Sequence, residues 1–185
     1  MKGIILAGGS GSRLNPLTSV ISKQLLPVYD KPLVYYPLST LISIGIDDIL
    51  LISNPNQMDL FKKLLGDGEN FGINITYAVQ KEPKGIAESL IIGEDFIGGE
   101  NCALILGDNI FISEHLSKSL SIEFSGGAQI FTKTVEDPQR YGVVNIKDGK
   151  PKEIIEKPDS FISNQAVTGL YIYDKYASLL CKSLK

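Results

Sequence analysis

Short runs rich in apolar residues alternate with segments of helical periodicity over the first part of the chain. The strand-length runs cover residues 2–6, 48–53, 73–80 and 102–109, and the segments with apolar residues at helical spacing cover residues 33–45, 57–66 and 85–93. Nearly continuous apolar strands are typical of parallel sheets, which helices cover on both faces. The alternation predicts an open α/β sheet, mostly parallel and Rossmann-like, with crossover helices.

Glycine and proline predict where the helices begin and end. Gly45 and Gly66 are the last residues of the first two helical segments, in the position where glycine commonly ends a helix. Pro37 lies inside the first segment, so either the helix begins near it or its first turn is kinked.

The second part of the chain has a different pattern, in which turns separate short strand-like pieces. These pieces cover residues 128–135, 142–146, 152–157 and 166–174, and residues 176–184 predict a last short helix. The sequence Lys-Asp-Gly at 147–149 suits a hairpin turn. We therefore expect a β-rich excursion packed against the α/β sheet, with residues 1–185 forming a single domain.

Composition excludes several classes of protein. The 185 residues are 43% hydrophobic and 21% charged, which is typical of a globular protein with a substantial core. A net charge of −3 argues against a nucleic-acid partner. Cys102 and Cys181 lie far apart without a metal-binding spacing, which favours a cytoplasmic location. We also expect no signal peptide and no membrane span.

A glycine-rich segment, GGSGSRL at residues 8–14, follows the first predicted strand. It lacks the Gly-Lys-Ser/Thr ending of a P-loop, and Leu14 stands where a dinucleotide-binding motif needs its third glycine. One interpretation as a phosphate-binding loop remains: the backbone N–H groups surround the phosphates of a nucleotide, and Arg13 supplies a cation. The alternative is a flexible turn that carries a surface arginine.

Six segments together resemble the sugar-1-phosphate nucleotidylyltransferases over almost the whole chain: LAGGSGSRL, SKQLLPVYDKPLVYYPLSTL, LGDNIF, RYGVV, EKP and AVTGLYIYD. The resemblance implies an α/β fold and the conversion of a nucleoside triphosphate and a sugar 1-phosphate into a nucleotide sugar and pyrophosphate. It is nearest to members that use dTTP and glucose 1-phosphate, whose product enters deoxysugar (rhamnose-type) and surface-polysaccharide synthesis. Members that use UTP are the alternative.

The resemblance also assigns charged residues to the phosphates. It implies that Arg13 binds the leaving pyrophosphate, that Lys23 assists at the phosphates, and that Lys157 holds the sugar phosphate. Asp108 ends an apolar strand, where ligands collect in open α/β sheets, and would bind Mg²⁺. The alternative for Asp108 is an ordinary turn aspartate. A phosphate nucleophile needs no general base, so we expect His115 at the surface.

The base and the sugar would be bound by residues of small or polar type. The amide of Gln80 can both donate to and accept from a pyrimidine edge, or Gln80 is simply an exposed polar residue that closes a strand. The resemblance implies nucleotide contacts at Gly8, Gly9, Gly11, Arg13, Gln80 and Gly85. It implies sugar contacts at Asn109, Gly142, Glu156 and Val167.

The C-terminal end is where the sequence departs from the family pattern. Members of the family continue into a Trp-Leu-Asp-Thr-Gly segment whose aspartate is the second magnesium ligand, and this sequence contains no tryptophan. We therefore expect the family's C-terminal portion to be absent, and a non-catalytic protein that binds nucleotide sugars is a second alternative. The expected partners are dTTP and glucose 1-phosphate, without nucleic acid or membrane, in a homo-oligomer.

Overall fold

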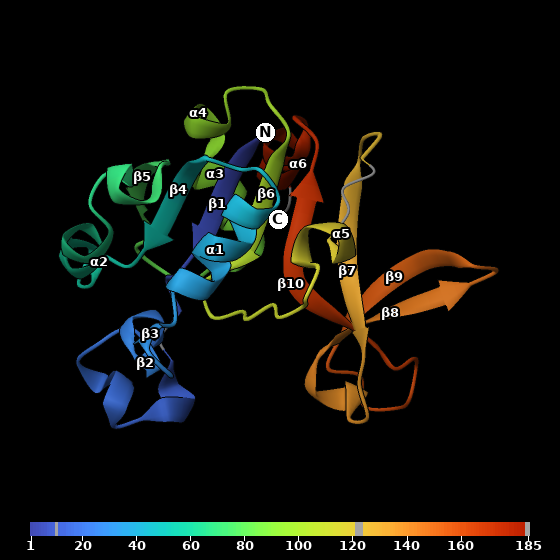
Figure 1. Ribbon diagram of the computed structural model, residues 1–185. Coiled ribbons are helices and arrows are strands. Elements are labelled where there is room, and N and C mark those ends of the chain that lie inside the picture. The colour runs from blue at the N-terminus through green and yellow to red at the C-terminus, as the bar shows by residue number, and fades with distance from the viewer. Residues whose placement is uncertain (10, 121–123, 184–185) are drawn as a thin grey trace.

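The computed structural model describes residues 1–9, 11–120 and 124–183 (Figure 1). An eight-stranded sheet has the order β5-β4-β1-β6-β10-β8-β9, and β7 pairs with β10. Its first four strands are parallel: β1 (Lys2–Leu6), β4 (Asp48–Ser53), β5 (Asn74–Val79) and β6 (Cys102–Leu106). This parallel core confirms the α/β prediction, although β6 ends at Leu106 and not at residue 109.

Helices cover both faces of the parallel strands. On one face lie α1 (Tyr35–Ser43) and α2 (Met58–Leu65), and on the other lie α3 (Ile86–Ile92), α4 (Glu94–Ile97) and α6 (Ala177–Lys182). Successive residues of β1 belong to the two cores, with Ile5 on the α1 face and Ile4 on the α3 face. Pro37 lies in the first turn of α1. The helix therefore begins near the proline, which is the first of the two alternatives.

The second half of the chain extends the sheet with antiparallel strands. These are β7 (Ala128–Thr134), β8 (Gly142–Lys147), β9 (Lys150–Glu156) and β10 (Gln165–Tyr173). β7 pairs with both the beginning and the end of β10, whereas β6 pairs with its end and β8 with its beginning. The hairpin of β8 and β9 projects away from the helices in Figure 1. The predicted β-rich excursion is thus confirmed as a continuation of the same sheet.

Short elements that the sequence pattern did not indicate complete the fold. A two-stranded hairpin, β2 (Pro27–Val28) and β3 (Lys31–Pro32), lies between the glycine-rich loop and α1, and a short helix, α5 (Leu116–Ser119), precedes β7. The hairpin is tied to α1 because Tyr36 Oη donates a hydrogen bond to Val28 O at 2.8 Å. None of the described helices is long and apolar enough to cross a membrane.

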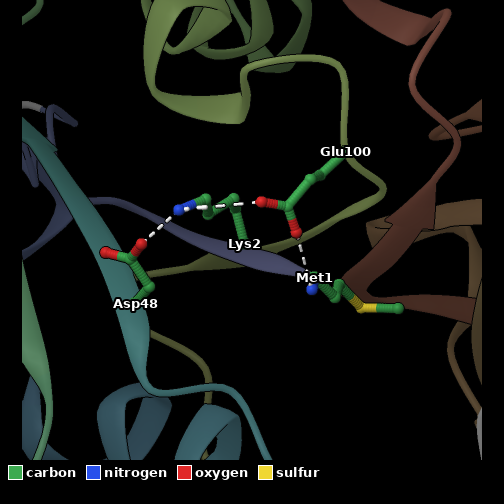
Figure 2. Close-up of polar contacts among 4 residues, drawn as sticks. All are labelled: Met1, Lys2, Asp48 and Glu100. Atoms are coloured by element: carbon green, nitrogen blue, oxygen red, sulfur yellow. Dashed lines mark hydrogen bonds and ion pairs between the residues drawn. The ribbon is translucent and has the colours of Figure 1, made fainter.

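An ion-pair cluster closes the edge of the sheet at which the parallel strands begin (Figure 2). The N-terminal ammonium of Met1 lies 3.0 Å from Glu100 Oε2, and Lys2 pairs with Asp48 and, at 3.8 Å, with Glu100. The hydrogen bond from this ammonium lowers the pKa of Glu100 below its ordinary value. The hydrogen bond to Asp48 raises the pKa of Lys2. The cluster therefore ties β1, β4 and the segment before β6 together.

Candidate functional site

The predicted site residues follow the carboxyl ends of the parallel strands, which meet at one edge of the sheet. Backbone hydrogen bonds continue the strand ladder past these ends. Gln80 N donates to Ser53 O at 2.8 Å, and Gly107 N donates to Leu6 O at 2.8 Å. These bonds fix the positions from which the glycine-rich loop, Gln80 and Asp108 leave the sheet.

The three described glycines of the loop meet different steric conditions, and Ser10 between them lies outside the described residues. A β-carbon on Gly8 would lie 2.4 Å from Gln80 Oε1, so no side chain fits there without displacing the amide. Gly11 has a φ of +62° and its carbonyl accepts a hydrogen bond from Thr18. Gly9 has open space around it, with no atom within 4 Å of a built β-carbon. The loop thus has one packed, one strained and one open position.

Lys23 and Asp108, which are 85 positions apart in the sequence, form an ion pair at this edge. Their side chains are 30% and 32% exposed. Together with Gly9, Gly11 and Gln24 they line a cavity of about 160 Å³. Asp108 is therefore paired with a cation beside the glycine-rich loop, which an ordinary turn aspartate would not require.

A second, larger cavity of about 750 Å³ adjoins the first through Asp108. Asn109, Tyr141 and Val167 also line it, so it contains two of the predicted sugar residues. Asn109 Nδ2 donates a hydrogen bond to the backbone oxygen of Thr168.

The position of Asn109 depends on a glycine that sequence reasoning missed. Gly169 lies at the irregularity in β10, with a φ of +78°, and a β-carbon on it would lie 2.4 Å from Asn109 Nδ2. A glycine inside a strand pattern is a signal for such a close approach, and it was present in the segment AVTGLYIYD.

The remaining sugar residues and Lys157 lie at the hairpin of β8 and β9. Gly142 pairs with Glu156, and a β-carbon on Gly142 would lie 3.0 Å from Glu156 Oε2. Lys157 Nζ lies 3.3 Å from Glu156 Oε1, and its backbone N donates to Tyr141 O at 3.0 Å. Tyr141 lines the larger cavity, so this bond joins the backbone of Lys157 to a lining residue, whereas Gly142, Glu156 and Lys157 do not line the cavity themselves.

Arg13 and Gly85 are not brought into contact with the other predicted residues. Arg13 is exposed in a short 3₁₀ helix, Ser12–Leu14, and its side chain has no hydrogen bond or ion pair within the described ranges. Gly85 precedes α3 with a φ of +98° and open space around it. His115 is exposed, as predicted.

Gln80 is buried, at 3% exposure, so its interpretation as an exposed polar residue that closes a strand is wrong. Its Nε2 donates a hydrogen bond to Glu88 Oε2 at 2.6 Å, and the backbone N of Lys84 donates to the same oxygen at 3.0 Å. Sequence reasoning missed Glu88. The only local signal was an acidic residue in the first turn of a helix, which is too common to indicate a site.

Within the described residues, Asp108 is the carboxylate beside the smaller cavity that fits a magnesium ion. Among residues 1–9, 11–120 and 124–183 no group of three or more His, Cys, Asp or Glu side chains converges as a metal-binding cluster. Mg²⁺ is commonly held by one or two carboxylates, with phosphate oxygens and water as its other ligands. Asp108 meets this requirement, since its carboxylate already faces a cationic group beside the smaller cavity.

Comparison with known proteins gives one consistent result. The sequence model of the family described as nucleotidyl transferase matches residues 2–185. Curated proteins named glucose-1-phosphate thymidylyltransferase are 54% identical in Mycolicibacterium smegmatis and 53% identical in Neisseria meningitidis serogroup A. Each match covers 100% of this chain and 65% of the relative, so the chain spans about two thirds of the length of these proteins.

Solved structures agree with the curated relatives. A Bacillus anthracis protein described as a glucose-1-phosphate thymidylyltransferase, in complex with a sucrose, has a TM-score of 0.93 at 44% identity. That match covers 100% of this chain and 76% of the other. A UDP-glucose pyrophosphorylase complexed with UDP-glucose has a TM-score of 0.85 at 26% identity, with 100% and 80% of the two chains covered.

Proposed function

This chain belongs to the nucleotidyl transferase family, and from that premise we propose that it transfers the thymidylyl group of dTTP to glucose 1-phosphate. A phosphate oxygen of the sugar forms a bond to the α-phosphorus of dTTP, and the bond from that phosphorus to the bridging oxygen breaks. The products are dTDP-glucose and pyrophosphate, which leaves with the electron pair of the broken bond. The proposal treats residues 1–185 as one nucleotidyltransferase domain.

The observation that carries the proposal is the position of Asp108 between two cavities. The smaller cavity lies against the glycine-rich loop, as a triphosphate site requires, and the larger contains Asn109 and Val167. A displacement at the α-phosphorus needs two phosphorylated substrates in line and close together. Adjacent cavities that share a charged residue provide that arrangement.

The cations of the site are proposed to offset the charge of the phosphates. The guanidinium of Arg13 has no partner among the described residues, and its fork of donors suits the leaving pyrophosphate. Lys23 would bind phosphate oxygens, and Lys157, at the neighbouring strand end, would hold the sugar phosphate. The nucleophile is already an anion at neutral pH, so positioning and charge carry the catalysis without a general base.

Magnesium is the proposed cofactor, with Asp108 as its protein ligand. When bound, the ion would neutralise phosphate charge and polarise the phosphorus–oxygen bond that breaks. The chain's own contribution is the carboxylate of Asp108 and the ammonium of Lys23, which is free to move from Asp108 onto a phosphate oxygen once a triphosphate enters.

Base and sugar recognition follow from the remaining residues. We assign the nucleotide to Gly8, Gly9, Gly11, Gln80 and Gly85, and the sugar to Asn109, Gly142, Glu156 and Val167.

A UTP-dependent activity is the second candidate, because the solved relative at 26% identity is described with UDP-glucose and the two bases differ by one methyl, worth ~1 kcal/mol. A dTDP-glucose product would serve deoxysugar and surface-polysaccharide synthesis.

Pyrophosphate release by the 185-residue chain tests the proposal. Release should require dTTP, glucose 1-phosphate and magnesium together, and it should fall when UTP replaces dTTP. An equal or higher rate with UTP would favour the second candidate. Nucleotide binding without release would overturn the catalytic proposal and favour a protein that only binds nucleotide sugars.

A further inference from the structure

The amide of Gln80 is held by a side chain to which the proposed function gives no role. Glu88 is the third residue of α3, and its Oε2 accepts a hydrogen bond from Gln80 Nε2 at 2.6 Å. The backbone N of Lys84 holds the same oxygen at 3.0 Å. The backbone before α3 therefore holds Glu88 in place. Glu88 in turn holds Gln80, which is 3% exposed.

This contact determines which end of the amide faces the glycine-rich loop. An ionised carboxylate can only accept hydrogen bonds, so the NH₂ group of Gln80 must face Glu88. The other end, Oε1, then lies beside Gly8, where a built β-carbon would be 2.4 Å away. In the part of the chain that the structure describes, no donor reaches this oxygen. Gln80 thus offers an unused acceptor to a ligand at the loop.

We propose that Glu88 is a positioning residue that makes Gln80 select pyrimidines with a donor at ring position 3. Thymine and uracil carry N–H at that position, whereas cytosine has an acceptor there and would face Gln80 Oε1 lone pair to lone pair. The inference rests on the proposed function, because it takes Gln80 as the residue that contacts the base. It separates thymine and uracil from cytosine, and it leaves thymine and uracil equivalent at this contact.

A purely structural role for Glu88 has different consequences. An acidic residue in the first turn stabilises a helix through the exposed N–H groups there, whichever nucleotide is bound. Loss of that role would lower the melting temperature and weaken all nucleotides alike. The ratio of affinities for dTTP and dCTP is therefore the readout that separates positioning from helix stabilisation.

Glu88→Met tests the inference, because methionine has a similar length and offers no strong acceptor to Gln80 Nε2. Glutamine would keep an oxygen where Lys84 N and Gln80 Nε2 both donate, whereas methionine leaves the amide of Gln80 free to turn over. Isothermal titration calorimetry with magnesium and dTTP, dUTP or dCTP should show that the parent chain favours the first two by about 10- to 100-fold. In Glu88→Met this preference should fall to within a few-fold, mainly because dTTP and dUTP bind less tightly.

Glu94→Met is the matched control. Glu94 lies in the first turn of α4 and pairs with Lys182 at 2.5 Å, so the substitution removes the same charge from a similar position. It does not contact Gln80, and it should leave the parent ratio of affinities unchanged. Gln80→Ala is the reference for complete loss of the preference.

Exchange of the two residues provides a rescue. In the double variant Gln80→Glu, Glu88→Gln, the amide at 88 donates to the carboxylate at 80, which again presents only acceptors to the loop. The preference for dTTP over dCTP should return to about tenfold or more. The exchange also decides the question if Glu88→Met is too unstable to titrate.

The outcomes that contradict the inference are distinct from those that contradict the proposed function. If Glu88→Met keeps the parent ratio while Gln80→Ala loses it, Glu88 does not position the amide and the proposed function stands. An exchange variant that folds but shows no preference contradicts the inference in the same way. A parent chain that binds none of the three nucleotides overturns the proposed function together with the inference.

Discussion

Two lysine–aspartate ion pairs lie at opposite edges of the same parallel strands. Lys2–Asp48 joins the beginnings of β1 and β4, and Lys23–Asp108 lies beyond the carboxyl ends. The two aspartates are 31% and 32% exposed, so neither chemistry nor exposure separates the pairs.

The surroundings of the two pairs do differ. Lys2 has a second carboxylate, Glu100, which also binds the N-terminal ammonium, so that edge is a closed network (Figure 2). Asp108 adjoins two cavities and a loop with an open glycine. We conclude that an ion pair alone does not mark a site. What marks the carboxyl edge is the space for a ligand in the two cavities that Asp108 lines.

The largest expected effect comes from Asp108→Asn. Loss of the carboxylate removes the proposed magnesium ligand and the partner of Lys23, and pyrophosphate release should fall roughly 100-fold or more. The melting temperature should change little, because the side chain is partly exposed. Asp48→Asn is the matched control at the other edge and should keep the parent rate. Equal rates in the two variants would remove Asp108 from the reaction.

Gly8→Ala and Gly9→Ala should differ although the residues are neighbours. The new methyl at Gly8 would overlap Gln80 Oε1, which we expect to cost about 1–3 kcal/mol of stability and to raise the KM for dTTP. At Gly9 the methyl meets no atom of the described residues within 4 Å, so stability should change by less than ~0.5 kcal/mol while the KM still rises. Thermal denaturation and steady-state kinetics measure both effects. Similar stabilities for the two variants would contradict the described packing of Gly8.

Arg13→Ala should raise the KM for dTTP about tenfold and leave the melting temperature unchanged. The guanidinium has no partner within the described residues, so its removal breaks no contact that the structure shows. A charge-assisted contact to the triphosphate would be lost. Arg13→Lys should recover part of the affinity, since it restores the charge but not the fork of donors. A drop in melting temperature without a change in KM would make Arg13 structural.

The smallest expected effect is the loss of stability in Glu100→Gln, at the edge where the parallel strands begin, and it depends on pH. The pKa of Glu100 is lowered from its ordinary value of 4.5 by the hydrogen bond from the N-terminal ammonium. Its contribution to stability is therefore fully present above 4.5 and is lost as the pH falls through the lowered pKa. The parent should melt slightly above Glu100→Gln at neutral pH, and this difference should vanish in acid. A difference that persists in acid would show that the ion pair is not its cause.

Local patterns predicted the parallel half of the fold closely, because they act within one element. The apolar runs marked β1 and β4 to the residue, and Gly66 marked the end of α2. The carboxyl ends of β5 and β6 also indicated where Gln80 and Asp108 would lie.

Contacts between distant segments could not be predicted in this way. Lys23 meets Asp108 across 85 positions, and Asn109 meets Gly169 through an irregularity in the register of β10. Glu88 is near Gln80 in sequence, yet nothing local shows that a first-turn acid will reach back to a buried amide. These contacts depend on how the strands assemble, which periodicity does not encode.

Amide hydrogen exchange of the 185-residue chain, with and without dTTP and magnesium, tests the contrast between the two edges most directly. We predict slower exchange in peptides that contain residues 8–11, 80–88 and 107–109, and unchanged exchange in peptides around Lys2, Asp48 and Glu100. Unchanged exchange at the carboxyl edge, or protection confined to the closed edge, would contradict this prediction.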